Sequence, residues 1–156
     1  EYVGRARGIR AAVILALDGG EVILVEQYRV PLGRPCLELP AGLVGDDAGS
    51  AGEAPLAAAA RELEEETGYR ARDWADLGEF CSSPGMVSET FTLLRATGLE
   101  QVGAGGGVGD EGIVVHRVPV AGLADFIAAA RARGLAVDVK LLVLLGAGLV
   151  EDAACR

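Results

Sequence analysis

Three glutamates with helical spacing are the residues of this chain best suited to chemistry. Glu62, Glu65 and Glu66 stand at positions i, i+3 and i+4, so a helix would place them on one face. Their charges repel one another, and the dipole at a helix C-terminus disfavours them further. Hard divalent cations such as Mg²⁺ prefer oxygen ligands and bridge to substrate phosphates. The pattern indicates a metal platform, although an acidic run taken alone is more often a solvated helix face.

The helix that must carry these glutamates has clear boundaries in the sequence. Pro55 suits the first helical turn, the segment continues through four alanines to Thr67, and Gly68 is typical of a C-terminal stop. Arg61 is placed to reach Glu65 one turn later. We expect Gly42–Gly52, which contains four glycines and two aspartates, to form a loop before the helix.

The remaining elements favour a mixed sheet covered by helices, an α/β (α+β) fold. Asp18-Gly19-Gly20 separates two apolar runs, which predicts a hairpin. The glycine-rich segment Gly103–Gly109 is expected to be flexible and to take no part in a core. The predicted strands are 9–17, 21–28, 36–39, 74–81, 89–96 and 113–119, with a loop at 30–35 and further helices at 121–133 and 138–149.

Length and composition exclude several classes of protein. The 156 residues, 51% hydrophobic and 24% charged, predict one globular domain over residues 1–156. A net charge of −9 disfavours nucleic-acid binding. The longest apolar run, Leu141–Val150, is ten residues, whereas a membrane span needs about 20. Three widely spaced cysteines and the absence of a signal-peptide pattern in the first five residues favour a cytoplasmic protein.

The acidic segment also resembles a known family signature. Glu53, seven further residues, and then Arg61-Glu62-Leu63-x-Glu65-Glu66-x-Gly68-Tyr69 are similar to the Nudix hydrolase pattern G-x5-E-x7-R-E-U-x-E-E-x-G-U. Eight of the nine defined positions match. The exception is the first glycine, because Asp47 stands six residues before Glu53. Its counterpart is Gly42, so the intervening loop carries five extra residues, which we expect to alter the loop more than the metal site.

This resemblance implies an α/β/α sandwich and hydrolysis of a nucleoside diphosphate linked to another moiety, with Mg²⁺ or Mn²⁺ as cofactor. It implies that Glu62 and Glu66 are the main metal ligands. Glu65 would support or share a metal, and the Ala41 carbonyl would be a further ligand. Glu53 would contribute through water.

A second set of motifs resembles the ADP-ribose pyrophosphatase subgroup. Pro84 follows Gly68 by sixteen residues, within Ser82–Glu89, and this spacing distinguishes it from an ordinary turn. The resemblance implies that Pro84, Gly85 and Met86 bind substrate. Further similar segments are 26–29, 37–42, 109–116 and 138–140.

The same subgroup resemblance implies roles for three charged residues. Arg29 would meet the substrate phosphates, for which a guanidinium offers a bidentate fork, or it would be a surface arginine. Glu89 would lie near the metals or the terminal ribose. Glu38 would face the site or serve as a structural carboxylate.

A general base must deprotonate the attacking water, and in these enzymes a mobile loop often supplies the carboxylate. Asp110 and Glu111 end the glycine-rich segment, and we favour Glu111. The predicted catalytic set therefore comprises Glu111, Glu65, Arg61 and Asp110. His116, the only histidine, is expected to have a structural or surface role.

The primary hypothesis is a metal-dependent pyrophosphohydrolase acting on ADP-ribose or a related nucleoside diphosphate sugar. One alternative keeps the chemistry and changes the substrate to another NDP-sugar, a dinucleotide or an NTP. A second alternative is a non-catalytic nucleotide sensor, against which the retained glutamates argue. We expect a homodimer, although only eight residues precede the first predicted strand.

Overall fold

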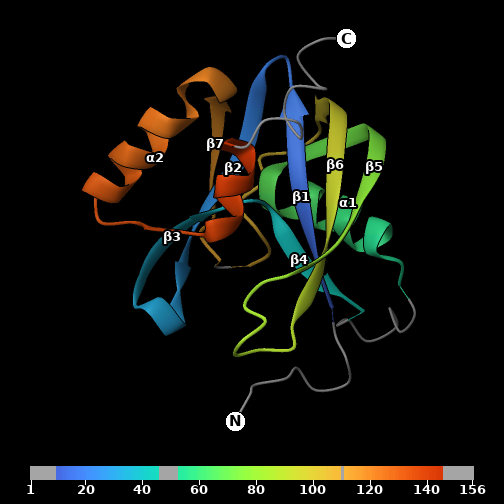
Figure 1. Cartoon of the computed structure of the whole chain (residues 1–156). Helices are drawn as coiled ribbons and strands as arrows, with labels where there is room; N and C mark the ends of the chain where they lie inside the picture. Colours follow the sequence, from blue (N-terminus) through green and yellow to red (C-terminus); the bar gives the residue numbers. More distant parts are fainter. Residues whose placement is uncertain (1–9, 46–52, 110, 146–156) are drawn as a thin grey trace.

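The computed structural model describes residues 10–45, 53–109 and 111–145 (Figure 1). The strands are β1 Arg10–Asp18, β2 Glu21–Arg29, β3 Arg34–Glu38, β4 Ala41–Val44, β5 Tyr69–Cys81, β6 Thr90–Gln101, β7 Val114–Pro119 and β8 Ala136–Val137. The helices are α1 Pro55–Thr67 and α2 Leu123–Ala132, with short 3₁₀ segments η2 Val30–Leu32, η3 Val120–Gly122 and η4 Val139–Leu145.

The first hairpin divides the sheet into two wings. β1 and β2 pair only beside their turn, at Leu17↔Val22 and Asp18↔Glu21. Beyond that point β1 pairs with β4 in antiparallel and with β6 in parallel orientation, and β6 pairs with β5. β2 pairs instead with β3 and β7, and β3 pairs with the short β8. The hairpin predicted from Asp18-Gly19-Gly20 is confirmed, and its two strands diverge beyond the turn (Figure 1).

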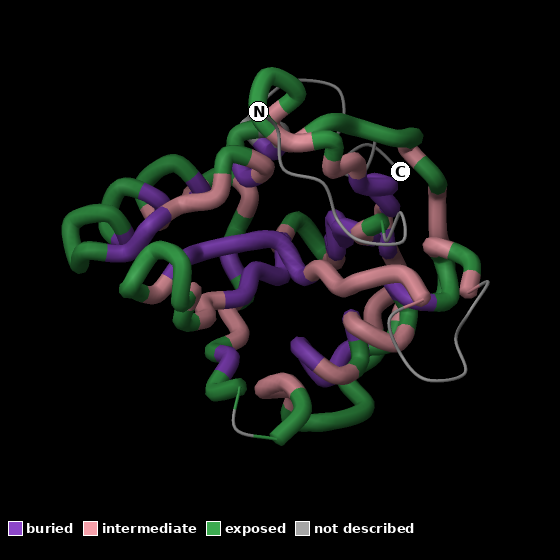
Figure 2. The backbone as a smooth tube through the Cα atoms, turned by 90° about the horizontal axis from the view of Figure 1, so that it is seen from below, coloured by how far each residue is buried: buried purple, intermediate pink, exposed green. Residues whose placement is uncertain are grey.

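Helices cover both faces of the sheet, because the side chains of β1 alternate between two cores. Ala12, Ile14 and Ala16 pack with Ala59 and Leu63 of α1. The opposite face of β1 packs against α2 and η4, through Val13, Leu15, Leu17, Leu123, Ile127 and Leu141. Buried residues accordingly run through the middle of the molecule (Figure 2). The predicted mixed sheet in an α/β/α arrangement is confirmed.

Helix α1 has the boundaries predicted from the sequence. Pro55 occupies its first turn, and Gly68 ends it in the left-handed conformation with φ +73°. The Gly68 N–H donates to the Glu64 carbonyl at 2.9 Å, which closes the last turn.

Two predicted loops differ from the structure. The loop expected over Gly42–Gly52 begins as strand, because 41–44 form β4 beside β1, and residues 46–52 lie outside the described part. The segment Gly103–Gly109, predicted to be flexible, is hydrogen-bonded to the end of α1. Its glycines allow close backbone contact, a use of glycine that composition alone does not reveal.

Other boundaries are shifted. β5 begins at Tyr69, five residues before the predicted strand, and β6 extends to Gln101. The final predicted helix is a 3₁₀ segment over 139–145, and the rest of it lies outside the described residues. Within the described residues, no helix is long and apolar enough to cross a membrane.

Candidate active site

The first part of the site is a group of carboxylates around Arg61. The Nη1 atom of Arg61 donates to Glu62 Oε1 at 2.9 Å and to Glu65 Oε2 at 3.1 Å. Its Nε atom lies 3.7 Å from Glu53 Oε1. Burial lowers the pKa of Arg61, but Glu62, Glu65 and Glu53 raise it, and the net shift is upward. The guanidinium therefore remains charged and offsets the repulsion between these carboxylates.

Glu66, on the same helix, is buried beside Ala41 of β4. Only 6% of the residue is exposed, and its Oε2 atom accepts a hydrogen bond from the Ala41 N–H at 3.0 Å. Burial raises the pKa of Glu66 to about 8, and the charge of Glu62 adds to the rise. The Ala41 hydrogen bond and the charge of Arg29 oppose it without cancelling it. Because burial destabilises the ionised form of Glu66, this carboxylate is stabilised by binding either a cation or a proton.

Gly42 leaves space for the Glu62 side chain where β4 passes α1. A Cβ atom at this position would lie 2.0 Å from Cδ and from Cγ of Glu62. Three residues later in the chain, the Gly45 N–H donates to Glu53 Oε2 at 3.3 Å. These contacts agree with Gly42 as the counterpart of the signature glycine, since only a residue without a side chain leaves Glu62 in place.

The residues present fit a hard divalent cation. Glu62, Glu65 and Glu66 offer carboxylate oxygens, and β4 brings the Ala41 backbone beside Glu66. Oxygen donors are the ligands that Mg²⁺ and Mn²⁺ prefer. Within the described residues, no three acidic, histidine or cysteine side chains already stand in a geometry that would hold an ion. The Arg61 hydrogen bonds to Glu62 and Glu65 would have to rearrange for cation binding.

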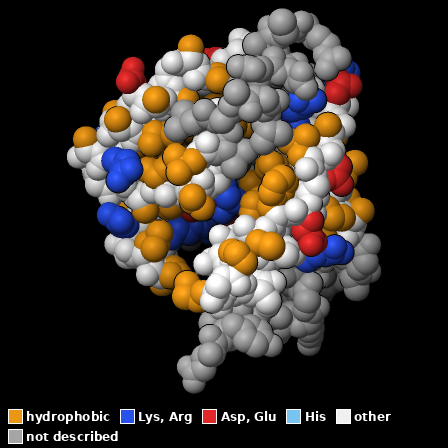
Figure 3. All heavy atoms as spheres, viewed as in Figure 1, with side chains coloured by type: hydrophobic (Ala, Val, Ile, Leu, Met, Phe, Trp, Pro, Cys, Tyr) orange, Lys and Arg blue, Asp and Glu red, His pale blue; other side chains and the backbone are white. Residues whose placement is uncertain are grey.

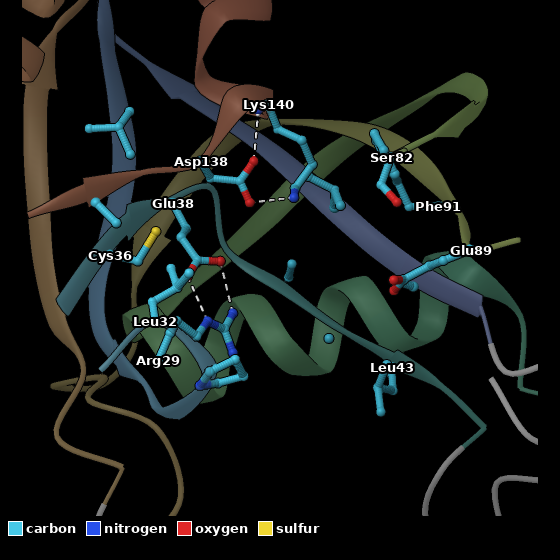
Figure 4. A pocket seen from close by; sticks show the side chains of 17 residues that line it. Arg29, Leu32, Cys36, Glu38, Leu43, Ser82, Glu89, Phe91, Asp138 and Lys140 are labelled. Carbon is cyan, nitrogen blue, oxygen red and sulfur yellow. Dashed lines mark hydrogen bonds and ion pairs between the residues drawn. The ribbon is translucent and has the colours of Figure 1, made fainter. Parts of the chain in front are cut away.

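A pocket of about 770 Å³ adjoins this helix (Figure 4). It lies between the wings, and Ala41 and Gly42 belong both to its wall and to the surroundings of the glutamates. Figure 3 shows basic side chains within a hollow that is bordered largely by apolar ones. The pocket is lined by Ala11, Val13, Arg29, Pro31, Leu32, Cys36, Glu38, Ala41, Gly42, Leu43, Ser82, Glu89, Phe91, Ala136, Val137, Asp138 and Lys140.

Arg29 and Glu38 form a bidentate pair in the pocket. Arg29 Nε donates to Glu38 Oε1 at 2.6 Å, and Nη2 donates to Oε2 at 2.8 Å. The hydrogen bond to Glu38 is the main cause of the raised pKa of Arg29, against the effect of burial. Glu38 is 6% exposed. Its pairing with Arg29 corresponds to the structural role that the sequence left open as one of two alternatives. Arg29 is held in the pocket wall with its guanidinium oriented.

A second basic residue of the pocket was not among the predicted site residues. The Lys140 ammonium donates to the Asp138 carboxylate and lies 5.7 Å from the centre of the Phe91 ring. The Lys140 backbone N–H also donates to Asp138 Oδ1, at 2.8 Å. The segment 138–140 resembled the subgroup in sequence, which was the available signal, but only the fold shows that it returns to the pocket.

The residues of the Ser82–Glu89 segment are separated in the structure. Ser82 and Glu89 line the pocket, and Glu89 lies on the side away from Arg29 (Figure 4). Pro84, Gly85 and Met86 are not among the lining residues, and Met86 is 61% exposed. Their predicted contact with substrate remains a prediction.

Glu111, the favoured candidate base, lies three residues after Val108 and contacts its backbone. Glu111 is exposed, and its Oε2 atom accepts a hydrogen bond from the Val108 N–H at 2.8 Å. Asp110 lies outside the described residues. His116 Nε2 lies 3.1 Å from Glu26 Oε2, and its ring packs edge-on against Phe126, in keeping with the predicted structural role.

Comparison with known proteins agrees with this geometry. The chain is 42% identical over 92 residues to an ADP-ribose pyrophosphatase of Mycobacterium tuberculosis, which covers 59% of this chain and 42% of that protein. It is 34% identical over 149 residues to a GDP-mannose pyrophosphatase of Enterobacter sp. (strain 638), covering 89% and 72%. It spans less than half the length of several curated relatives that it matches.

A solved structure described as an ADP compounds hydrolase superposes with a TM-score of 0.70 at 26% identity. The match covers 90% of this chain and 72% of that one. The NUDIX domain family matches residues 6–125, a range that contains all of α1 and the carboxylates around Arg61. The chain therefore belongs to the Nudix family.

Proposed function

We propose that this protein hydrolyses the pyrophosphate bond of ADP-ribose or a related nucleoside diphosphate sugar, with Mg²⁺ or Mn²⁺ as cofactor. Water attacks one phosphorus, the bridging P–O bond breaks, and a nucleoside monophosphate and a sugar phosphate leave. The observation that carries this proposal is the position of the carboxylate helix α1. Its buried Glu66 is hydrogen-bonded to Ala41, and Ala41 is part of the wall of a large pocket that contains basic residues.

The proposed metal ligands are the carboxylates of Glu62, Glu66 and Glu65 and the Ala41 carbonyl. A divalent cation held by these oxygens would supply positive charge to offset the charge that develops on the phosphate oxygens, and would make a nearby water more acidic. Arg61 keeps the carboxylates together between turnovers through its hydrogen bonds to Glu62 and Glu65. The bound divalent cation and nearby basic side chains would thus attract an anionic substrate to a protein whose net charge is negative.

The pocket residues have separate proposed roles. Arg29, oriented by Glu38, binds phosphate oxygens, and Glu89 faces the metals or the terminal sugar. Lys140 supplies a second cation to the same cavity. We propose Glu111 as the general base, with Asp110 as the alternative. Loop residues of this kind can move into place when substrate binds.

Two observations bear on the substrate. ADP-ribose is favoured by the names of two relatives at 42% and 44% identity, and a third relative, at 46% identity, is named an ADP-sugar pyrophosphatase. The matches span only part of the length of these relatives. GDP-mannose is the second candidate, because the GDP-mannose pyrophosphatase matches a much larger share of this chain. Both are nucleoside diphosphate sugars, so the same bond is broken and the base and sugar differ.

The test is product formation in Mg²⁺ from ADP-ribose, GDP-mannose, UDP-glucose, NADH and diadenosine polyphosphates, each separated by chromatography. We expect the fastest turnover with ADP-ribose, giving AMP and ribose 5-phosphate. Preference for GDP-mannose would retain the mechanism and change the substrate. Inactivity on every compound, with Mg²⁺ binding intact, would overturn the proposal and favour a nucleotide sensor.

We also propose a homodimeric, cytoplasmic enzyme whose residues 1–156 form a single domain. Cys36 and Cys81 are free thiols, which fits a reducing compartment. Large apolar side chains are exposed beside the pocket, including Val30 at 81% and Val139 at 64%, and contact with a second subunit would cover such residues. Size-exclusion chromatography with light scattering tests the dimer.

A further inference from the structure

The glycine-rich segment after β6 is attached to the turn of α1 that carries two of the glutamates. The Gly106 N–H donates to the Glu66 carbonyl at 2.9 Å, and the Gly107 N–H donates to the Glu65 carbonyl at 3.1 Å. The last carbonyls of a helix lack partners within the helix. Residues 105–108, which we call the glycine clasp, supply these partners from a distant part of the chain.

Close approach of the two backbones requires glycine in the clasp. Gly105 has φ +66°, and a Cβ atom there would lie 2.4 Å from the Thr67 carbonyl carbon and 2.7 Å from the Thr67 oxygen. Because these are backbone atoms, a larger residue could be accommodated only by moving the clasp away from the helix. Such a movement would lengthen both hydrogen bonds to α1.

The clasp also holds the candidate base. Val108 N–H donates to Glu111 Oε2 at 2.8 Å, and a Cβ atom at Gly107 would lie 2.2 Å from the same oxygen. The Ile113 N–H donates to the Gly106 carbonyl at 3.1 Å and anchors the segment where it leads into β7. One short stretch of backbone therefore contacts both the Glu111 carboxylate and the turn that carries Glu65 and Glu66.

We propose that the glycine clasp is a positioning element that couples the Glu111 loop to the metal-binding turn of α1. This inference rests on the proposed function, since it assigns Glu65 and Glu66 to a cation. A cation that fixes this turn disfavours opening of the clasp. By thermodynamic linkage, separation of the clasp from the helix must weaken cation binding by the same factor.

Amide hydrogen exchange of the wild-type protein tests the first direction. We would measure the exchange of the Gly106 and Gly107 amides by NMR in EDTA and in saturating Mg²⁺. The Gly134 amide, which donates to the Arg131 carbonyl at 2.9 Å, is the control for global stabilisation. We expect Mg²⁺ to slow the two clasp amides at least fivefold more than Gly134. Equal slowing of all three would overturn the coupling.

Two alanine variants test the reverse direction. Gly105→Ala introduces the clash with Thr67, whereas Gly109→Ala has nearly the same backbone strain, with φ +68°, and no atom within 4 Å of the new Cβ. Mn²⁺ affinity is measured by electron paramagnetic resonance, and melting in EDTA shows that each variant is folded. We expect Gly105→Ala to weaken Mn²⁺ binding at least tenfold and Gly109→Ala less than twofold.

The outcomes separate the two proposals. Equal Mn²⁺ affinity in both folded variants would overturn the clasp and leave the proposed function intact. Wild-type protein that binds no Mn²⁺ would overturn the proposed function itself. If Gly105→Ala does not fold, the exchange experiment on the wild-type protein decides the question alone.

Discussion

Replacement of Glu66 by glutamine is expected to stabilise the metal-free protein in a pH-dependent way. The glutamine keeps the shape of the side chain, and its carbonyl oxygen can accept the Ala41 hydrogen bond that Glu66 Oε2 accepts at 3.0 Å. The two side chains differ in charge, because the glutamine amide stays neutral at every pH of the experiment whereas the Glu66 carboxyl group can ionise. In the wild type the buried carboxylate must either hold a proton or remain ionised with little solvation by water.

The sign and size follow from the pKa of Glu66. The folded protein holds this pKa at about 8, against an ordinary value of 4.5, mainly because of burial. Between these two pH values the folded state binds more protons than the unfolded chain, so stability falls as the pH rises through that window. At about 1.4 kcal/mol for each pKa unit, the full loss is about 5 kcal/mol. At pH 7.5 it is about 4 kcal/mol.

The assay is urea unfolding in EDTA at pH 5 and pH 8. We expect Glu66→Gln and wild type to differ little at pH 5, and the variant to be more stable by several kcal/mol at pH 8. Glu64→Gln is the matched control, because Glu64 lies on the same helix but is exposed and paired with Arg70. The reasoning is refuted if the wild type and Glu66→Gln have the same difference in unfolding free energy at both pH values.

Three further substitutions test other contacts of the site. Gly42→Ala places a Cβ atom 2.0 Å from the Glu62 side chain, so we expect at least tenfold weaker Mn²⁺ binding by calorimetry; unchanged affinity would contradict the packing argument. Arg29→Lys loses the bidentate pair with Glu38, so unfolding free energy should fall by about 1–3 kcal/mol and KM should rise, and an unaltered KM would remove Arg29 from the phosphate site. Glu111→Gln should lower kcat far more than substrate affinity in steady-state kinetics, and a full kcat would exclude Glu111 as the base.

Helix α1 and its carboxylates could be predicted from the sequence because the relevant signals are local. Pro55 and Gly68 mark the ends, and the helical period alone places Glu62, Glu65 and Glu66 together. The signature spacing also pointed to Gly42 as the counterpart of the first signature glycine, and the structure adds that Gly42 lies against the Glu62 side chain.

The pocket could not be predicted to the same degree, because its residues come together through strand register. Arg29 meets Glu38 only because β2 and β3 pair with Arg29 opposite Arg34 and Val25 opposite Glu38. Lys140 reaches the cavity from the other end of the chain. Such contacts depend on tertiary structure, which local propensity does not encode.

The glycine-rich segment shows a different limit of sequence reasoning. Five glycines in seven residues are typical of a flexible linker, yet here several of them lie in left-handed conformations against a helix end. At Gly105 and Gly68 a side chain would collide with backbone atoms. Composition does not distinguish a glycine needed for flexibility from one needed for close packing.

The central claim is that the carboxylates of α1 serve the hydrolysis of a nucleoside diphosphate sugar. Its most direct test is the quantification of AMP and ribose 5-phosphate from ADP-ribose in Mg²⁺, for the wild type and for Glu62→Gln. The account predicts equimolar products from the wild type, none in EDTA, and a loss of at least a hundredfold in the variant. Undiminished product formation in EDTA, or by Glu62→Gln, would contradict it.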